Sequence, residues 1–242
     1  MSKKINECYW CGNIATSKEH VPPKCLFPEK KDMQNISEAN FRKDLITVPS
    51  CDEHNLEKSN DDEYLMECIA SIVGNNGIAY IHSRTKVARS LARNSKALDI
   101  VSNGTLKINN TKFPVSIINV DTKRLSYSFE AIARALYYYE CGKQFNGECR
   151  VFSPIFRNAL NEEGCKWLDY IKSEIENEKD KWEEKGSNPE IFKYRLGLED
   201  SLGSRLLLLT FYNNVEIYIT LTSIRACEYF RNNGLRYRKV GK

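Results

Sequence analysis

The chain has 242 residues, of which 41% are hydrophobic and 28% are charged, and its formal net charge is +4 at pH 7. This composition is typical of an ordinary soluble globular protein and excludes a wholly disordered chain. The basic start lacks an apolar stretch behind it and the longest apolar runs are strand-sized, so we expect a cytoplasmic protein with no membrane segment.

Two regions of different character divide the chain. Residues 1–75 are rich in Cys, His, Pro and Asn, whereas periodic helical and strand patterns begin after them. The Gly74-Asn75-Asn76-Gly77 stretch between the regions is typical of a helix end followed by a turn. We therefore predict an α+β protein with an N-terminal module over residues 1–75 and a mixed α+β domain over residues 76–242.

The first motif in the chain is Cys8-Tyr9-Trp10-Cys11-Gly12, a C-x2-C pair followed by a glycine that tolerates a tight turn. Later in the module, Cys51-Asp52-Glu53-His54 repeats the same spacing. Nine cysteines in a reducing compartment favour metal ligation over disulfides. Cys8, Cys11, Cys51 and His54 therefore form a candidate structural zinc site, with Cys25 or Cys68 as the alternative fourth ligand. Buried cysteines that serve only as small apolar side chains are the competing interpretation.

Several helices and strands are predicted after the second motif. A helix is predicted from Asn55 to Ile72, and a second one over residues 78–98. Strands are predicted over residues 105–109 and 113–120, with a turn at Asn109-Asn110. Two further helices, a β-hairpin and a basic tail follow, and the hairpin has Asn213-Asn214 as its two-residue turn. The predicted ranges are helices 128–141 and 162–185, hairpin strands 205–212 and 215–221, and a tail from residue 225.

Positive charge is concentrated downstream of the module. Residues 76–112 carry seven lysines and arginines against the single carboxylate of Asp99. One helix face holds the candidates for nucleic-acid contact, which are Lys86, Arg89, Arg93 and Lys96. The basic tail is a second candidate, with Arg231, Arg236, Arg238 and Lys239. The alternative is that both groups are solubilising surface charges.

The N-terminal motifs together resemble the HNH endonuclease superfamily, the ββα-metal nucleases, in its zinc-containing branch. The resemblance covers roughly residues 7–66 and rests on the knuckles at Cys8–Cys11 and Cys51–His54, on Glu19-His20, on Asp44-Leu45-Ile46 and on Asn55 through Lys58. The sequence departs from the family pattern in having Glu19 in place of Asp, His54 in place of Cys and Asp44 in place of the central Asn. It also has a longer insertion, over residues 29–42.

The resemblance implies a role for each motif residue. His20 would be the general base, and Glu19 and Asn55 would bind one catalytic Mg²⁺ or Mn²⁺. Asp44 would orient the imidazole, while Asp61 and Asp62 are either auxiliary ligands or part of a solvated acidic face. Successive residues of a strand face opposite ways, so Glu19 and His20 can act together only where the strand ends or bends, as Pro22-Pro23 would enforce.

The function implied by the resemblance is a metal-dependent endonuclease that hydrolyses phosphodiester bonds in DNA, with structural zinc and catalytic magnesium or manganese. RNA is an alternative substrate, and a phage-defence or mobile-element setting is implied by analogy. One rival hypothesis is a non-catalytic zinc-binding module that binds nucleic acid or protein. The other is a nuclease subunit that acts only with a partner protein, such as an ATPase or a sensor.

Overall fold

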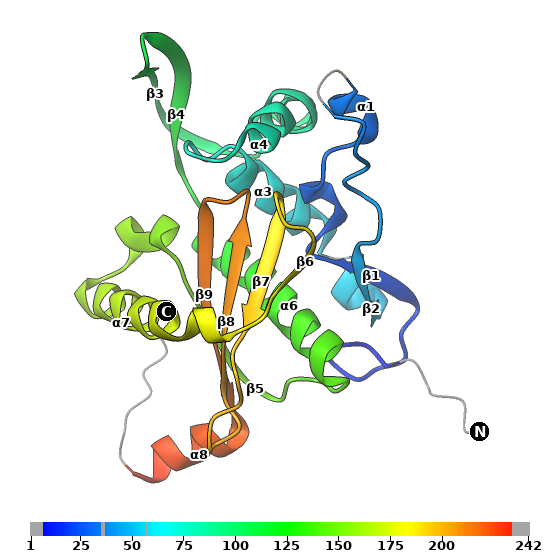
Figure 1. Cartoon of the computed structure of the whole chain (residues 1–242), viewed down its shortest axis with the longest axis vertical. Coiled ribbons are helices and arrows are strands. Elements are labelled where there is room, and N and C mark those ends of the chain that lie inside the picture. Colours follow the sequence, from blue (N-terminus) through cyan, green and yellow to red (C-terminus); the bar gives the residue numbers. More distant parts are fainter. Residues whose placement is uncertain (1–6, 35–36, 57, 234–242) are drawn as a thin grey trace.

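The computed structural model describes residues 7–34, 37–56 and 58–233 (Figure 1). It contains helices and three separate antiparallel sheets, so the predicted α+β class is confirmed. Arg236, Arg238 and Lys239 of the predicted basic tail lie outside the described residues. In the described part of the chain, no helix is both long enough and apolar enough to cross a membrane.

The N-terminal region contains a two-stranded sheet, with two short helices between its strands and two helices after the second strand. Its elements are β1 (Ser17–Val21), the 3-10 helix η1 (Lys24–Leu26), α1 (Lys30–Met33), β2 (Ile46–Ser50), α2 (Asp52–Asn55) and α3 (Ser59–Ala70). Strands β1 and β2 pair in a regular antiparallel register. The single helix predicted from Asn55 is wrong, because Asn55 ends α2 and a new helix begins at Ser59.

The middle of the chain forms a helix with a π-helical segment, followed by a long hairpin. Its elements are α4 (Gly77–His82), the π-helix η2 (Ser83–Val87), α5 (Ala88–Arg93), β3 (Asp99–Ile108) and β4 (Thr111–Asn119). The helix predicted over residues 78–98 therefore contains a π-helical segment and ends earlier, at Arg93. The predicted turn at Asn109-Asn110 is confirmed, and both residues have the positive φ, 45° and 65°, that a type I′ turn requires.

A five-stranded antiparallel sheet in the order β5-β9-β8-β7-β6 forms the centre of the molecule. Its strands are β5 (Gly147–Phe152), β6 (Glu184–Asn188), β7 (Phe192–Leu196), β8 (Arg205–Phe211) and β9 (Val215–Ser223). The remaining helices are α6 (Thr122–Cys141), η3 (Pro154–Ala159), α7 (Glu162–Glu178), η4 (Lys179–Lys181) and α8 (Ile224–Asn232). Helices α6 and α7 lie on opposite faces of the sheet (Figure 1).

Strand β8 has apolar residues at successive positions because both faces of the sheet are buried there. Leu207 and Leu209 point into the larger core that contains α6, whereas Leu208 points into the smaller core beneath α7. A strand covered on both faces is expected to be apolar at successive positions. The hairpin predicted here is confirmed, but its loop has three residues, Tyr212 to Asn214, because Phe211 pairs with Val215. The helix predicted over residues 162–185 ends at Glu178.

The larger core is continuous across the predicted boundary between residues 75 and 76. It contains Leu26 and Leu65 from the N-terminal region together with Phe129 and Phe211 from the rest of the chain. The buried hydroxyl of Tyr212 also donates a hydrogen bond of 2.7 Å to the carbonyl oxygen of Leu26. The division into two domains stays a prediction, and the two regions share one core.

This shared core predicts the effect of Tyr212→Phe. The substitution leaves the buried Leu26 carbonyl without its donor, so we expect the free energy of unfolding to fall by about 1–2 kcal/mol. Chemical denaturation followed by circular dichroism measures this change. Tyr139→Phe is the matched control, because Tyr139 is 54% exposed and should tolerate the loss of its hydroxyl. Equal stability of the two variants would contradict the proposed role of this bond.

Candidate metal centre

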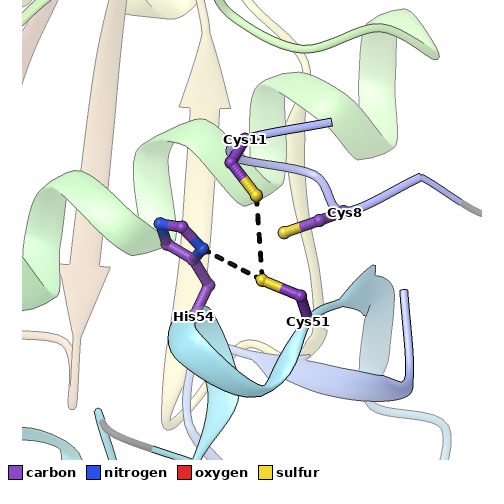
Figure 2. Close-up of side chains that lie close together, drawn as sticks. All are labelled: Cys8, Cys11, Cys51 and His54. Carbon is purple, nitrogen blue, oxygen red and sulfur yellow. Dashed lines mark hydrogen bonds between the residues drawn. The ribbon is translucent and has the colours of Figure 1, made fainter. Parts of the chain in front are cut away.

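The first knuckle is a tight turn built by backbone hydrogen bonds. The amide of Cys8 donates to the carbonyl of Asn13 at 2.7 Å, and the amide of Gly12 donates back to the carbonyl of Cys8 at 3.1 Å. Gly12 has φ of +77°, a conformation that costs a glycine little. The turn therefore brings the thiols of Cys8 and Cys11 to one side of the chain (Figure 2).

The second knuckle is the start of α2. Cys51 is the N-cap residue of that helix, and His54 lies within its single turn. The Sγ atom of Cys51 is 3.7 Å from Sγ of Cys11 and 3.2 Å from Nδ1 of His54. The ligand atoms of Cys8, Cys11, Cys51 and His54 all lie within 4.8 Å of one another (Figure 2).

This cluster could hold a metal ion such as zinc. Three thiol sulfurs and one imidazole nitrogen are a donor set that structural zinc uses, and the predicted set of four is confirmed as a cluster. The alternative fourth ligands lie elsewhere: the thiol of Cys25 donates to the carbonyl of Asp62 at 3.1 Å, and Cys68 is buried in α3.

Protonation of the thiols depends on local hydrogen bonds. Burial opposes ionisation of Cys8, but the backbone amides of Cys11 and Trp10 outweigh it, so the pKa of Cys8 lies below its usual value. Burial raises the pKa of Cys51 to about 11. A bound cation would favour the thiolate form of these side chains.

Helix α6 supports the cluster through an aromatic stack that sequence reasoning missed. The ring of Trp10 stacks on His54, with centroids 4.9 Å apart and planes at 29°. On α6, Tyr127 lies 5.3 Å from the Trp10 ring and the guanidinium of Arg134 lies 5.2 Å from it. The side-chain amide of Gln144 donates to the carbonyl of Cys8 at 3.2 Å. The cluster thus joins two turns of the N-terminal region to a helix of the central core.

Glu19 lies in a buried ionic cluster on the helix-facing side of β1. Its carboxylate is 2.5 Å from the ammonium of Lys58, which in turn lies 2.6 Å from Asp62. Glu19 is 6% exposed and Lys58 is 2% exposed. Burial raises the pKa of Glu19 to about 7, although Lys58 acts in the opposite direction. The carboxylate of Glu19 is therefore already paired with the ammonium of Lys58.

The structure separates the predicted catalytic side chains into two groups. Asn55 lies on the same side of β1 as Glu19, because its amide donates to Oγ of Ser17 at 2.7 Å. His20 pairs with Thr47 in the regular part of the strand, so its side chain points to the opposite face from Glu19. Burial, with Lys24 and Arg42, holds the pKa of His20 below its usual value, which favours the neutral imidazole.

Asp44 lies apart from both groups. It is exposed in the loop before β2 and has a positive φ of 55°. Its backbone carbonyl accepts a hydrogen bond of 2.6 Å from the hydroxyl of Ser187. Its exposed carboxylate lies 3.8 Å from the ammonium of Lys43. The predicted role in orienting the imidazole has no support in this geometry.

Most of the predicted nucleic-acid-binding face pairs with carboxylates of the N-terminal region. Arg89 makes a bidentate ion pair with Asp32 at 2.9 and 2.7 Å. Arg93 lies 2.8 Å from Glu63, and Lys86 lies 3.8 Å from Glu29. Lys96 is exposed, and the described residues give it no ion pair. Three of the four charges therefore help to attach α5 and η2 to the N-terminal region.

The predicted auxiliary ligands also form ion pairs within the chain, Asp61 with Arg124 and Asp62 with Lys58.

We expect Cys11→Ser to abolish metal binding and to unfold the N-terminal region, because structural zinc contributes folding free energy directly. Elemental analysis of the purified protein and its thermal melting profile measure both effects. Cys165→Ser is the matched control, because Cys165 lies outside the cluster. Normal zinc content and melting in Cys11→Ser would contradict the assignment.

Lys58→Met should destabilise the protein by about 3 kcal/mol at pH 7, because it leaves Glu19 buried without a counterion. Adding Glu19→Gln to Lys58→Met should restore most of this loss. Lys166→Met, at an exposed pair, is the control and should change little. A double variant as unstable as the single one would show that the unpaired Glu19 is not the cause, and would leave the unpaired Asp62 and lost packing as the sources of the instability.

The same substitution has a predicted pH dependence. The pKa of Glu19 is already raised from 4.5 to about 7 with Lys58 present, and removing the ammonium raises it further. The wild type therefore loses stability as pH rises from 4.5 to about 7, and so does the variant. Above pH 7 only the variant still holds the proton, so its free energy of unfolding goes on falling relative to that of the wild type. A difference in stability between variant and wild type that does not grow as pH rises above 7 would contradict this interpretation.

Comparisons of the chain with protein-family models, with curated proteins and with solved structures find no match. The HNH resemblance therefore rests on the motif residues of the sequence.

Proposed function

We propose that the chain is a divalent-metal-dependent nuclease of the HNH type, with DNA as its substrate. The observation that carries the proposal is the strand–strand–helix unit closed by the Cys/His cluster. In that unit Asn55 directly follows a cluster residue, His54, and is hydrogen-bonded across to β1. The same strand carries Glu19 and His20, so the residue types needed for metal-assisted hydrolysis lie on adjoining elements.

In this proposal His20 takes a proton from the attacking water, and its neutral form suits that role. The oxygen atoms of Glu19 and Asn55 would hold Mg²⁺ or Mn²⁺, which supplies charge relief at the scissile phosphate. The water oxygen bonds to phosphorus as the bond from phosphorus to the leaving oxygen breaks.

Metal binding at Glu19 requires Lys58 to move. Its ammonium lies between the carboxylates of Glu19 and Asp62, so a divalent cation can bind Glu19 only if this ammonium moves away. His20 must also turn toward the metal from the other face of β1, and Val21 at the end of the strand is the point where the backbone could bend. Binding of metal and substrate would have to supply the free energy for both changes.

The buried pair favours a second candidate function. Glu19 paired with Lys58 is complete without a metal, as a structural ion pair would be. A non-catalytic zinc-stabilised module that binds nucleic acid or a protein partner is consistent with that geometry. A nuclease that needs an ATPase or sensor partner to rearrange the site is a third candidate.

Nicking of supercoiled plasmid in Mg²⁺ or Mn²⁺ tests the proposal. We expect the wild type to cut and His20→Ala to lose cutting by about 10²-fold or more with zinc content unchanged, because the general base is removed. Asn55→Ala should lose cutting that added Mn²⁺ partly restores. Lys18→Ala is the matched control, because Lys18 is exposed on the same face of β1 as His20.

Two outcomes would count against the proposal. If His20→Ala cuts as fast as the wild type, His20 is not the base. If neither DNA nor RNA is cut by the wild type, alone or from cells that supply its partners, the non-catalytic module is the better account.

A further inference from the structure

The hairpin of β3 and β4 is a separate two-stranded sheet that extends away from the central sheet (Figure 1). All ten residues of β3 are exposed. A two-stranded ribbon with so little packing is marginally stable alone, so its length calls for an explanation. We call this element, residues 99–119, the ribbon.

The two faces of the ribbon differ in chemistry. On one face Leu106 pairs with Phe113, whose ring contacts Tyr80 of α4 edge-on at 6.5 Å. This apolar face is thus turned in part toward the body of the protein. The opposite face is polar and consists of three cross-strand pairs, which are Asn103 with Ser116, Thr105 with Pro114, and Lys107 with Lys112.

Beyond Asp99, the charged side chains of the ribbon are all positive. The sequence has no Asp or Glu between Asp99 and Asp121. Lys107 and Lys112 lie directly opposite each other near the tip, an arrangement that destabilises a strand pair through like-charge repulsion. Neither lysine makes an ion pair within residues 7–34, 37–56 and 58–233. An anionic partner would relieve the repulsion, whereas the arginines of α5 already have carboxylate partners.

We infer that the polar face of the ribbon binds the major groove of duplex DNA. The major groove admits a two-stranded β-ribbon, and amides and hydroxyls such as Asn103, Thr105 and Ser116 can hydrogen-bond base edges. Lys107 and Lys112 would contact phosphates, and exposed Lys96 before the ribbon adds a third cation. The inference rests on the proposed function and deepens it, since it supplies a substrate contact away from the candidate metal centre.

The competing occupant is a second copy of this chain. Ile108 is 48% exposed and Ile117 is 65% exposed, both on the apolar face. The unpaired lysine pair on the other face favours DNA, because two copies meeting there would bring four ammonium groups together. Self-association through the apolar face is therefore an outcome that the experiment must distinguish.

The test measures binding without cleavage. Fluorescence anisotropy with a 20-base-pair DNA duplex, without added divalent metal, compares the full chain with Lys107→Ala/Lys112→Ala at several salt concentrations. We expect the double variant to bind roughly tenfold more weakly at low salt, and the slope of log affinity against log salt to fall by about two. Lys166→Ala/Lys181→Ala is the matched control, because it removes two exposed lysines elsewhere. Duplex RNA should bind more weakly, because its narrow major groove does not admit side chains.

Each result has a defined reading. Unchanged affinity and salt slope in the ribbon variant, or an equal loss in the control, would overturn the inference. If Ile117→Ser changes the mass measured by light scattering while the lysine variant binds DNA normally, the ribbon is instead an interface between copies. Binding that depends on the ribbon in a chain that cuts nothing would leave the inference standing and remove only the proposed nuclease activity.

Discussion

The interaction on which the rest of the N-terminal region depends is the convergence of Cys8, Cys11, Cys51 and His54. The two short turns are far apart in sequence and meet through a hydrogen bond of 2.9 Å from the amide of Tyr9 to the carbonyl of Pro49. A shared cation would fix both turns and, through the stack of Trp10 on His54, seat them on α6. The pairing of β1 with β2 and the start of α2 are then set by the same anchor.

A second constraint is the ionic cluster between β1 and the start of α3. Glu19, Lys58 and Asp62 form a buried cluster of two carboxylates and one ammonium, and its stability requires all three groups to stay close together. Any metal-dependent activity has to compete with this arrangement, whereas a purely structural module would retain it. The balance between Lys58 and a divalent cation therefore links the stability of the fold to the proposed chemistry.

Much of the metal centre could be predicted from the sequence, because the two x2 spacings and the glycine after Cys11 encode tight turns locally. The turn at Asn109-Asn110 was predictable for the same reason. By contrast, the ion pairs of Arg89 and Arg93 join residues distant in sequence, so a helical wheel shows a basic face but not its carboxylate partners. The Lys58–Glu19 pair was missed likewise. The strands β5, β6 and β7 were not predicted, since their short segments mix polar and apolar residues.

X-ray absorption at the zinc edge of the purified protein tests the central claim most directly. We predict a first shell of three sulfurs at about 2.3 Å and one nitrogen at about 2.0–2.1 Å, from Cys8, Cys11, Cys51 and His54. A protein that contains no zinc, or a shell made mainly of oxygen, would contradict it.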